Sequence, residues 1–247
     1  MMVAPSVRVV DDAAAAVPLL LDELQNTIDR GRRPLVGFAT GSTFTTFLRA
    51  LAAAIDAGRV RTDAFVATHL DEYEGFAPER RGGMVDELFT ACPPFRAMYE
   101  RGAFVPVPHV VDAGVIAAHE RRLAELGGVA LQFVGIGRNG HIAFHEPGVP
   151  LDRSFHVAEL AATTRDDARA RFAPDLVPRR AITSGTATIL RASRVVMAAF
   201  GASKVPAVAA MLGGPIAPSC PAAVLRSHPR LAVVLDRAAA TGLETTA

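Results

Sequence analysis

Residues 133–148 read Phe-Val-Gly-Ile-Gly-Arg-Asn-Gly-His-Ile-Ala-Phe-His-Glu-Pro-Gly, an apolar run that passes into a glycine-rich turn. Glycine permits positive φ and lets a ligand come close to the backbone. The turn is followed by His141, His145 and Glu146, side chains of the types that move protons near neutral pH. The stretch therefore predicts a buried strand that ends at a site of proton transfer.

Short β-branched or apolar runs elsewhere predict further strands, and Ala-rich amphipathic stretches between them predict helices. The expected strands are Val7–Val10, Leu35–Phe38, Phe65–His69, Ala130–Ile136, Val195–Phe200 and Leu231–Leu235. The expected helices are Ala13–Arg30, Thr43–Ala57, Val115–Leu126, Thr186–Ala192 and Lys204–Leu212. Such alternation is typical of an α/β fold with a mostly parallel sheet that has helices on both faces. No repeat or low-complexity linker divides the 247 residues, so we expect a single domain over residues 1–247.

The segment Gly148–Arg180 differs from the rest of the chain. It is rich in charge, is interrupted by prolines and contains one helix candidate, Thr163–Phe172. A segment of this length between core elements is often a lid or a binding flap. We therefore expect a lid at about residues 149–180, although a variable surface excursion fits the sequence equally well.

Composition limits the classes of partner. The formal net charge is +1, with 50% hydrophobic and 21% charged residues, which indicates a folded protein without a basic surface for nucleic acid or anionic lipid. Cys92 and Cys220 are too few for a disulfide framework, and Met1–Val10 does not resemble a signal peptide. We expect a cytoplasmic protein that binds a small molecule and neither nucleic acid nor membrane. The sequence leaves open whether it forms a homo-oligomer.

Open parallel sheets bind ligands at the carboxyl ends of their strands, and polar residues follow several of the expected strands. Thr40, Gly41, Ser42 and Thr43 follow the second strand and begin a helix. Free amides at a helix N-terminus attract anions, so this segment is a candidate phosphate cradle. The alternative interpretation is an ordinary Ser/Thr cap of the helix.

Two further strand ends carry charge. Asp71 and Glu72 directly follow an apolar strand, and adjacent side chains on an extended backbone point opposite ways, so only one can face a site. The alternative is an acidic residue that merely forms a turn. Lys204 follows Gly201 at an expected helix start, where its charge opposes the helix dipole unless an anion is bound. We favour a phosphate contact for Lys204 over a surface lysine.

Two familiar motifs are rejected. The spacing of Gly135, Gly137 and Gly140 matches the dinucleotide fingerprint, but Pro147 and Gly148 end any helix too soon after the glycines. His141 and His145, four residues apart, could bind zinc on a helix, but a third ligand is not evident. Neither a dinucleotide nor a metal is expected.

Across these motifs the chain resembles the glucosamine-6-phosphate deaminase (isomerase) family, in its short bacterial form. The resemblance covers roughly Leu35 to Asp236, and its longest motif, Gly135–Gly148, ends in the Glu-Pro-Gly that the related 6-phosphogluconolactonases lack. It implies a modified Rossmann-type sheet and a hydrolase acting on a C–N bond. That enzyme converts glucosamine 6-phosphate and water to fructose 6-phosphate and ammonium, and it needs no cofactor.

The resemblance also implies roles for individual residues. Asp71 would take the C2 proton and return it to C1, and His141 would open the sugar ring with support from Glu146 and Asn139. The phosphate would be held by Thr40, Gly41, Ser42, Thr43, Arg171 from the lid, and Lys204. Further substrate contacts would come from Glu72, Gly137 and His145.

Some residues depart from the family pattern. Asn139 stands where many members have Asp, so it adds no negative charge beside His141. His145 stands where the family usually has Asn, which leaves the sugar preference open. The Gly148–Phe155 stretch does not match the activator site of allosteric members, so no activation by N-acetylglucosamine 6-phosphate is expected.

Three other functions are compatible with this fold class. They are a galactosamine-6-phosphate deaminase, a 6-phosphogluconolactonase, and a sugar-phosphate sensor domain without enzymatic activity. A sensor would be expected to lose the catalytic set, yet Asp71, His141 and Glu146 are all present.

Overall fold

The computed structural model describes residues 5–243 and has a seven-stranded sheet, all of whose strand pairs are parallel. The strand order is β1-β10-β9-β6-β2-β3-β5. The strands are β1 (Ser6–Val10), β2 (Leu35–Phe38), β3 (Val66–His69), β5 (Phe104–Val105), β6 (Val129–Val134), β9 (Val195–Ala199) and β10 (Leu231–Asp236). The expected α/β fold with a mostly parallel sheet is confirmed.

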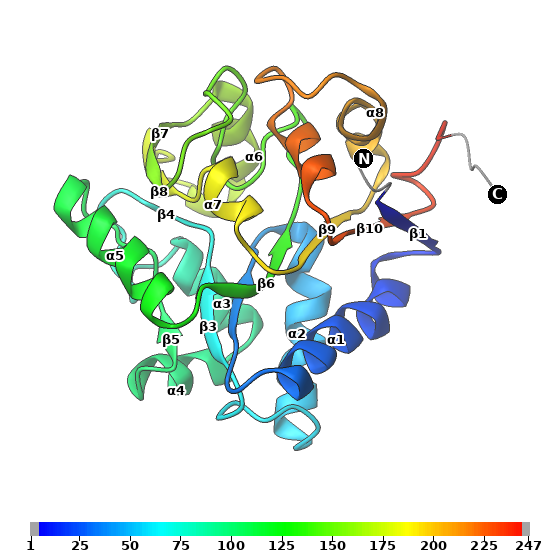
Figure 1. The fold of residues 1–247 in the computed structure, drawn as a ribbon. Helices are drawn as coiled ribbons and strands as arrows, with labels where there is room; N and C mark the ends of the chain where they lie inside the picture. The colour runs from blue at the N-terminus through cyan, green and yellow to red at the C-terminus, as the bar shows by residue number, and fades with distance from the viewer. Residues whose placement is uncertain (1–4, 244–247) are drawn as a thin grey trace.

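Helices cover both faces of this sheet. They are α1 (Ala13–Arg30), α2 (Ser42–Asp56), α3 (Met84–Ala91), α4 (Pro94–Glu100), α5 (Ala113–Glu125), α6 (Ala162–Phe172), α7 (Thr186–Leu190) and α8 (Val205–Gly213), with short 3-10 helices η1 (Ala202–Lys204) and η2 (Pro221–Ser227). In Figure 1, α1 and α2 lie below the sheet and α7 and α8 lie above it. No helix in the described part of the chain is long and apolar enough to cross a membrane.

The strand order determines where a ligand can bind. From β1 through β2 and β3 to β5 the chain moves toward one edge of the sheet, and from β6 through β9 to β10 it moves toward the other. Because crossovers between parallel strands are right-handed, these two halves place their helices on opposite faces. The neighbours β2 and β6 therefore send their following loops apart, which opens a crevice at their carboxyl ends.

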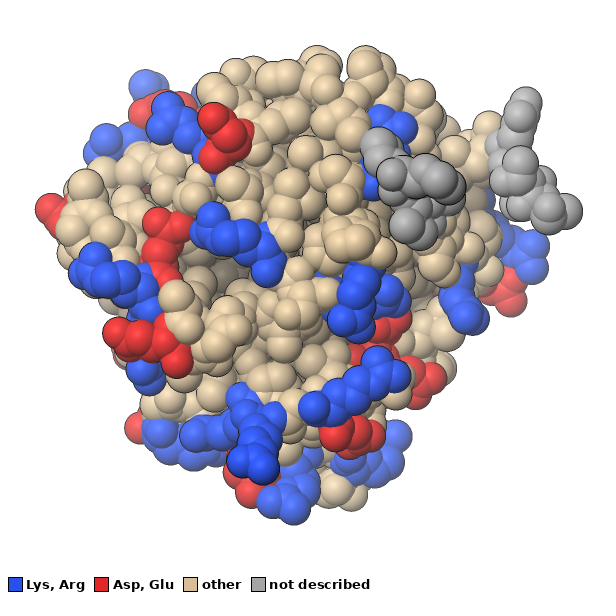
Figure 2. Space-filling model, viewed as in Figure 1, with Lys and Arg blue, Asp and Glu red and all other residues tan. Residues whose placement is uncertain are grey.

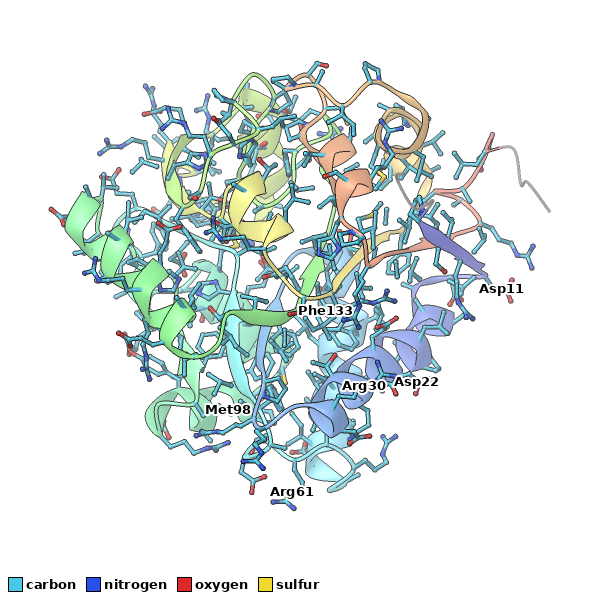
Figure 3. The ribbon with its side chains drawn as sticks, viewed as in Figure 1. Asp11, Asp22, Arg30, Arg61, Met98 and Phe133 are labelled. Atoms are coloured by element: carbon cyan, nitrogen blue, oxygen red, sulfur yellow. The ribbon has the colours of Figure 1, made fainter. Side chains whose placement is uncertain are left out.

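Aromatic rings fill the centre of the larger core. Phe133 of β6 and Phe38 of β2 are fully buried and stack with ring centroids 5.8 Å apart. Phe44 and Phe47 of α2 pack on the same Phe133 ring from one face of the sheet. Figure 3 labels Phe133 near the middle of the molecule. The strand that opens the motif at 133–148 is therefore also the centre of the core.

A second, antiparallel sheet was not expected. Its strands, in order, are β4 (Asp71–Tyr73), β8 (Arg180–Thr183) and β7 (His156–Glu159). The segment expected to be a lid supplies β7, α6 and the start of β8. Phe172 of α6 packs against Tyr73, with ring centroids 5.1 Å apart, so the segment is joined to β4 by buried aromatic contacts.

The surface shows no dominant charge. Figure 2 shows basic and acidic side chains interspersed over the face in view, in agreement with the net charge of +1.

We expect Phe133→Ala to lower the free energy of unfolding by about 3–5 kcal/mol, because it leaves a cavity among three aromatic rings. Phe133→Leu keeps most of the volume and should cost less than about 2 kcal/mol. Equilibrium unfolding in urea measures both values. Equal losses for the two variants would show that the ring is not tightly packed.

Candidate active site

A pocket of about 580 Å³ lies at the carboxyl ends of β2, β3, β6 and β9. Its wall is formed by the loops after these strands, and α6 closes one side with Thr164, Ala168 and Arg171. Four loops from distant parts of the sequence thus meet around one space, as the crevice between β2 and β6 requires.

The structure brings most of the expected site residues together. Those that line the pocket are Thr40, Gly41, Ser42, Thr43, Asp71, Gly137, His141, Arg171 and Lys204. The other four, Glu72, Asn139, His145 and Glu146, lie behind this wall.

The start of α2 has the geometry of an anion site. Gly41 is the residue before the helix, has φ of +86°, and no side chain caps the helix. The hydroxyl of Thr40 instead lies 3.0 Å from the Met84 sulfur. The interpretation of this segment as an ordinary Ser/Thr cap is therefore wrong. The first amides of α2 have no partner within the helix and remain able to bind an anion.

Lys204 reaches the pocket from the opposite side. It ends η1 directly before α8, and its Nζ donates to the Ile136 carbonyl at 2.8 Å, in the loop after β6. Burial lowers the pKa of this ammonium. A half-buried cation held by one neutral carbonyl gains from an anion beside it.

Asp71 begins β4, and its backbone pairs with Thr183 of β8. Its side chain is only 7% exposed and lines the pocket. Burial, together with the negative charges of Glu72 and Glu87, raises the Asp71 pKa to about 8, against the opposing effect of Arg171. A carboxyl group with a pKa near neutral is suited to accept and return a proton.

Glu72 points away from the pocket, as expected for a neighbour of Asp71 on a strand. Its carboxylate accepts three backbone hydrogen bonds, from Tyr73 at 2.8 Å, Met84 at 2.9 Å and Val85 at 3.0 Å. Met84 and Val85 begin α3, so the Glu72 carboxylate anchors that helix to β4. This position gives Glu72 a structural task and no direct contact with the pocket.

The imidazole of His141 lies against a carboxylate. Its Nδ1 is 3.5 Å from Glu146 Oε2 and 3.2 Å from the Thr164 hydroxyl. Because Nδ1 interacts with Glu146, Nε2 is the ring nitrogen that can exchange a proton with a ligand. This is the arrangement of an acid–base histidine oriented by a buried carboxylate.

Glu146 itself is firmly held. Thr164 donates to it at 2.5 Å, the Asn139 amide at 3.0 Å and the Ala161 backbone at 3.2 Å. Burial alone would raise its pKa, but the hydrogen bonds and the charge of His141 outweigh burial and lower the pKa to about 2. Glu146 is therefore ionised at neutral pH.

Asn139 acts on this pair indirectly. Its amide nitrogen donates to Glu146, while its carbonyl oxygen accepts from the His141 backbone at 3.2 Å. The amide thus orients the loop and the carboxylate, and its hydrogen bonds go to Glu146, Thr163 and the His141 backbone.

His145 is fully buried behind the pocket. Its Nε2 is 3.4 Å from the Val149 carbonyl, and its ring is 5.2 Å from that of His156. Burial, with the nearby His156, lowers the His145 pKa to about 4, so the ring is neutral at pH 7. No group of three or more metal-binding side chains occurs within residues 5–243.

Arg171 of α6 forms a second polar group with Tyr73 and Glu87. Arg171 donates to the Tyr73 hydroxyl at 2.7 Å and forms an ion pair with Glu87. Glu87 and the supporting role of Thr164 were not predicted. Residues 164, 168 and 171 are spaced to share one helix face, a signal that could have identified Thr164. Glu87 lies on α3, which the sequence patterns did not indicate.

The fold and pocket define an α/β protein with an acid–base pair and an anion cradle at the carboxyl edge of its sheet. The chain belongs to the family described as glucosamine-6-phosphate isomerases/6-phosphogluconolactonase, whose model matches residues 10–233. It is 35% identical to a glucosamine-6-phosphate deaminase of Streptomyces avermitilis, over 96% of this chain and 92% of that protein. It is 36% identical to one of Rhodopirellula baltica, over 98% and 97%.

Solved structures agree with the fold. A monomeric glucosamine-6-phosphate deaminase superposes with a TM-score of 0.84 at 28% identity, over 95% of this chain and 98% of that chain. A 6-phosphogluconolactonase from Leishmania guyanensis reaches 0.77 at 16% identity, over 98% of this chain and 99% of that one, a likeness of fold alone.

Gly137→Ala should disturb His141. A Cβ at Gly137 would lie 2.3 Å from both Cε1 and Nε2 of the His141 ring, so the ring has to move. We expect kcat to fall at least about tenfold, since a displaced acid–base group loses its geometry. Steady-state kinetics with a thermal melt provide the check. Ala at Gly148, where a Cβ has open space but φ is +92°, is a control for backbone strain alone.

Asp71→Asn should stabilise the protein at neutral pH. The folded pKa of about 8 lies above the ordinary 3.8, so the unfolded chain releases this proton first and stability is lost as pH rises between these values. Asn cannot ionise, and we expect a gain of about 2–4 kcal/mol at pH 7 that vanishes near pH 4. Urea unfolding at both pH values measures it. A variant less stable than wild type at pH 7 would contradict the environment assigned to Asp71.

Proposed function

We propose that this protein converts glucosamine 6-phosphate and water to fructose 6-phosphate and ammonium. One observation carries the proposal: Asp71 and the Glu146-oriented His141 line the same pocket as an uncapped helix start and two cationic side chains. The relatives that share 35–36% of their residues over nearly the whole chain bear the name of this enzyme.

The phosphate would bind between the start of α2, Lys204 and Arg171. The amides of Ser42 and Thr43 supply oriented donors, Lys204 supplies a compact charge, and Arg171 supplies a forked contact from the lid helix. Binding energy from this remote dianion can fix the position of the reacting carbons.

The chemistry needs one group for oxygen and one for carbon. His141 Nε2 moves a proton between the sugar oxygens as the ring opens, with Glu146 stabilising the charged imidazole. In the open-chain sugar the C2 proton is acidified by the C1 aldehyde. Asp71 takes this proton while O1 gains a proton through His141, which gives an enolamine; Asp71 then delivers its proton to C1, which leaves a protonated imine at C2. Water then hydrolyses the imine and releases ammonium.

The environment of Asp71 sets an expected pH dependence. The base must be ionised, so turnover should rise as pH increases toward the Asp71 pKa of about 8.

A 6-phosphogluconolactonase is the second reaction class. Solved 6-phosphogluconolactonase structures share the fold with this chain at 17% identity or less. A lactonase needs no base at C2, whereas Asp71 lines the pocket here. A galactosamine-6-phosphate deaminase would use the same groups, because the pair Asp71 and His141 acts on C1 and C2 and does not read C4.

Three attributes remain part of this proposal. The location is the cytoplasm, which the free, buried Cys92 and Cys220 support. Activation by N-acetylglucosamine 6-phosphate is not expected. A homo-oligomer is compatible with the fold, and a measurement of the protein's mass in solution tests it.

Incubating the purified protein separately with glucosamine 6-phosphate, galactosamine 6-phosphate and 6-phosphogluconolactone tests the proposal. We expect ammonium and ketose phosphate from the first substrate. Asp71→Asn should reduce kcat by about 10³-fold or more while inhibitor binding persists. Glu74→Gln removes an acid that pairs with Arg180 outside the pocket and serves as the matched control. Near-normal ammonium release by Asp71→Asn, or hydrolysis of the lactone alone, would refute the assignment.

A further inference from the structure

Glu87 is an acidic side chain in the pocket that the proposed chemistry does not use. Its Oε1 accepts from the Gly41 backbone N–H at 2.5 Å, and its Oε2 accepts from the Arg171 guanidinium. Gly41 and Arg171 are two of the groups assigned above to the substrate phosphate. In this structure a carboxylate of the protein therefore occupies part of the phosphate cradle.

We propose that the Glu87 carboxylate competes with the substrate phosphate for the donors of Gly41 and Arg171. The phosphate must displace this carboxylate in order to bind, and this requirement makes Glu87 a determinant of specificity. This inference rests on the proposed function, since it assigns those two donors to a phosphorylated substrate. It adds a step to binding: exchange of an internal anion for an external one.

The two anions cannot occupy the site together. A phosphate oxygen on the Gly41 amide would take the place of Glu87 Oε1, and the two negative charges would then be in direct contact inside a partly closed pocket. Like charges at such a distance repel strongly where water is limited. Full engagement of the phosphate therefore requires Glu87 to leave.

Glu87 is able to leave. Its side chain is 20% exposed, and α3 stays in place because Glu72 anchors its first amides. Arg171 also has a second N–H group that can bind an anion, because its Nε is buried without a hydrogen-bond partner in the described part of the chain. An entering anion can contact this N–H and the α2 amides before the bond between Arg171 and Glu87 breaks.

The exchange favours phosphate over weaker anions. A ligand carboxylate would replace one singly charged group by another and gain little. A phosphate dianion brings more charge and a third acceptor oxygen toward the α2 start and Lys204. Glu87 would thus reject sugar acids and unphosphorylated sugars, at the expense of affinity for the true substrate.

The test removes the charge and keeps the shape. For Glu87→Gln we expect the Kd of inorganic phosphate, measured by titration calorimetry, to fall about tenfold. The KM for glucosamine 6-phosphate should fall by a similar factor, while the effect on kcat is smaller. Glu87→Ala, which vacates both donors, should also bind phosphate more tightly than wild type.

Asp86→Asn is the matched control. Asp86 is the residue before Glu87 on α3, accepts from the Gly82 amide at 2.9 Å and does not line the pocket. Its variant loses the same charge, and the Kd of phosphate should stay at the wild-type value.

The outcomes separate this inference from the proposed function. Weaker or unchanged phosphate binding in both Glu87 variants would overturn the inference, and Glu87 would then serve to position Arg171. Tighter phosphate binding by the Glu87 variants, together with no ammonium release from glucosamine 6-phosphate by the wild-type protein, would support the role of Glu87 and refute the proposed reaction. Tighter binding by Asp86→Asn as well would also overturn the inference, because net charge alone would account for the effect.

Discussion

The divergence of the chain after two neighbouring strands is the constraint on which the site depends. β2 and β6 are paired, yet their following loops belong to halves of the fold that place their helices on opposite faces. The proposed phosphate cradle follows β2 and the proposed acid–base loop follows β6, so the same opening exposes both. Stacked Phe38 and Phe133 hold the two strands together directly below it.

Negative charge is concentrated around this opening. Four largely buried carboxyl groups lie here, and they differ in their hydrogen-bond partners: Asp71, Glu72, Glu87 and Glu146. Glu72 is satisfied by backbone amides, Glu146 by hydroxyl, amide and imidazole groups, and Glu87 by a guanidinium and one amide. Asp71 receives no such partner within residues 5–243, and burial raises its pKa to about 8, above the value of about 7 to which burial raises the pKa of Glu72. The group that is left unsatisfied is the one available for proton transfer.

The sequence predicted most of the framework from hydrophobic patterns. All the expected strands of the main sheet and all the expected helices are present, with ends shifted by at most a few residues. The small sheet of β4, β7 and β8 was missed because its strands are short and are stabilised by long-range pairing. α3 and α4 were missed because they are short, and they follow a glycine pair and a proline respectively. The pocket residues could be placed because they follow strand ends, whereas Glu72 and His145 could not be assigned a direction without knowledge of the tertiary contacts. Glu87 was missed together with its helix.

The adjacency of Asp71 and Glu72 has a mechanical consequence. One carboxylate faces the pocket while the next residue is fastened to the first turn of α3, so the backbone between them has little freedom to move. The start of α2 is equally fixed by its place at the end of a central strand. A base and an anion-binding site on such rigid supports stay at a fixed distance from each other. Only a sugar whose reacting carbon lies at the matching number of bonds from its phosphate can reach both, so chain length is selected by the frame before any hydroxyl group is recognised.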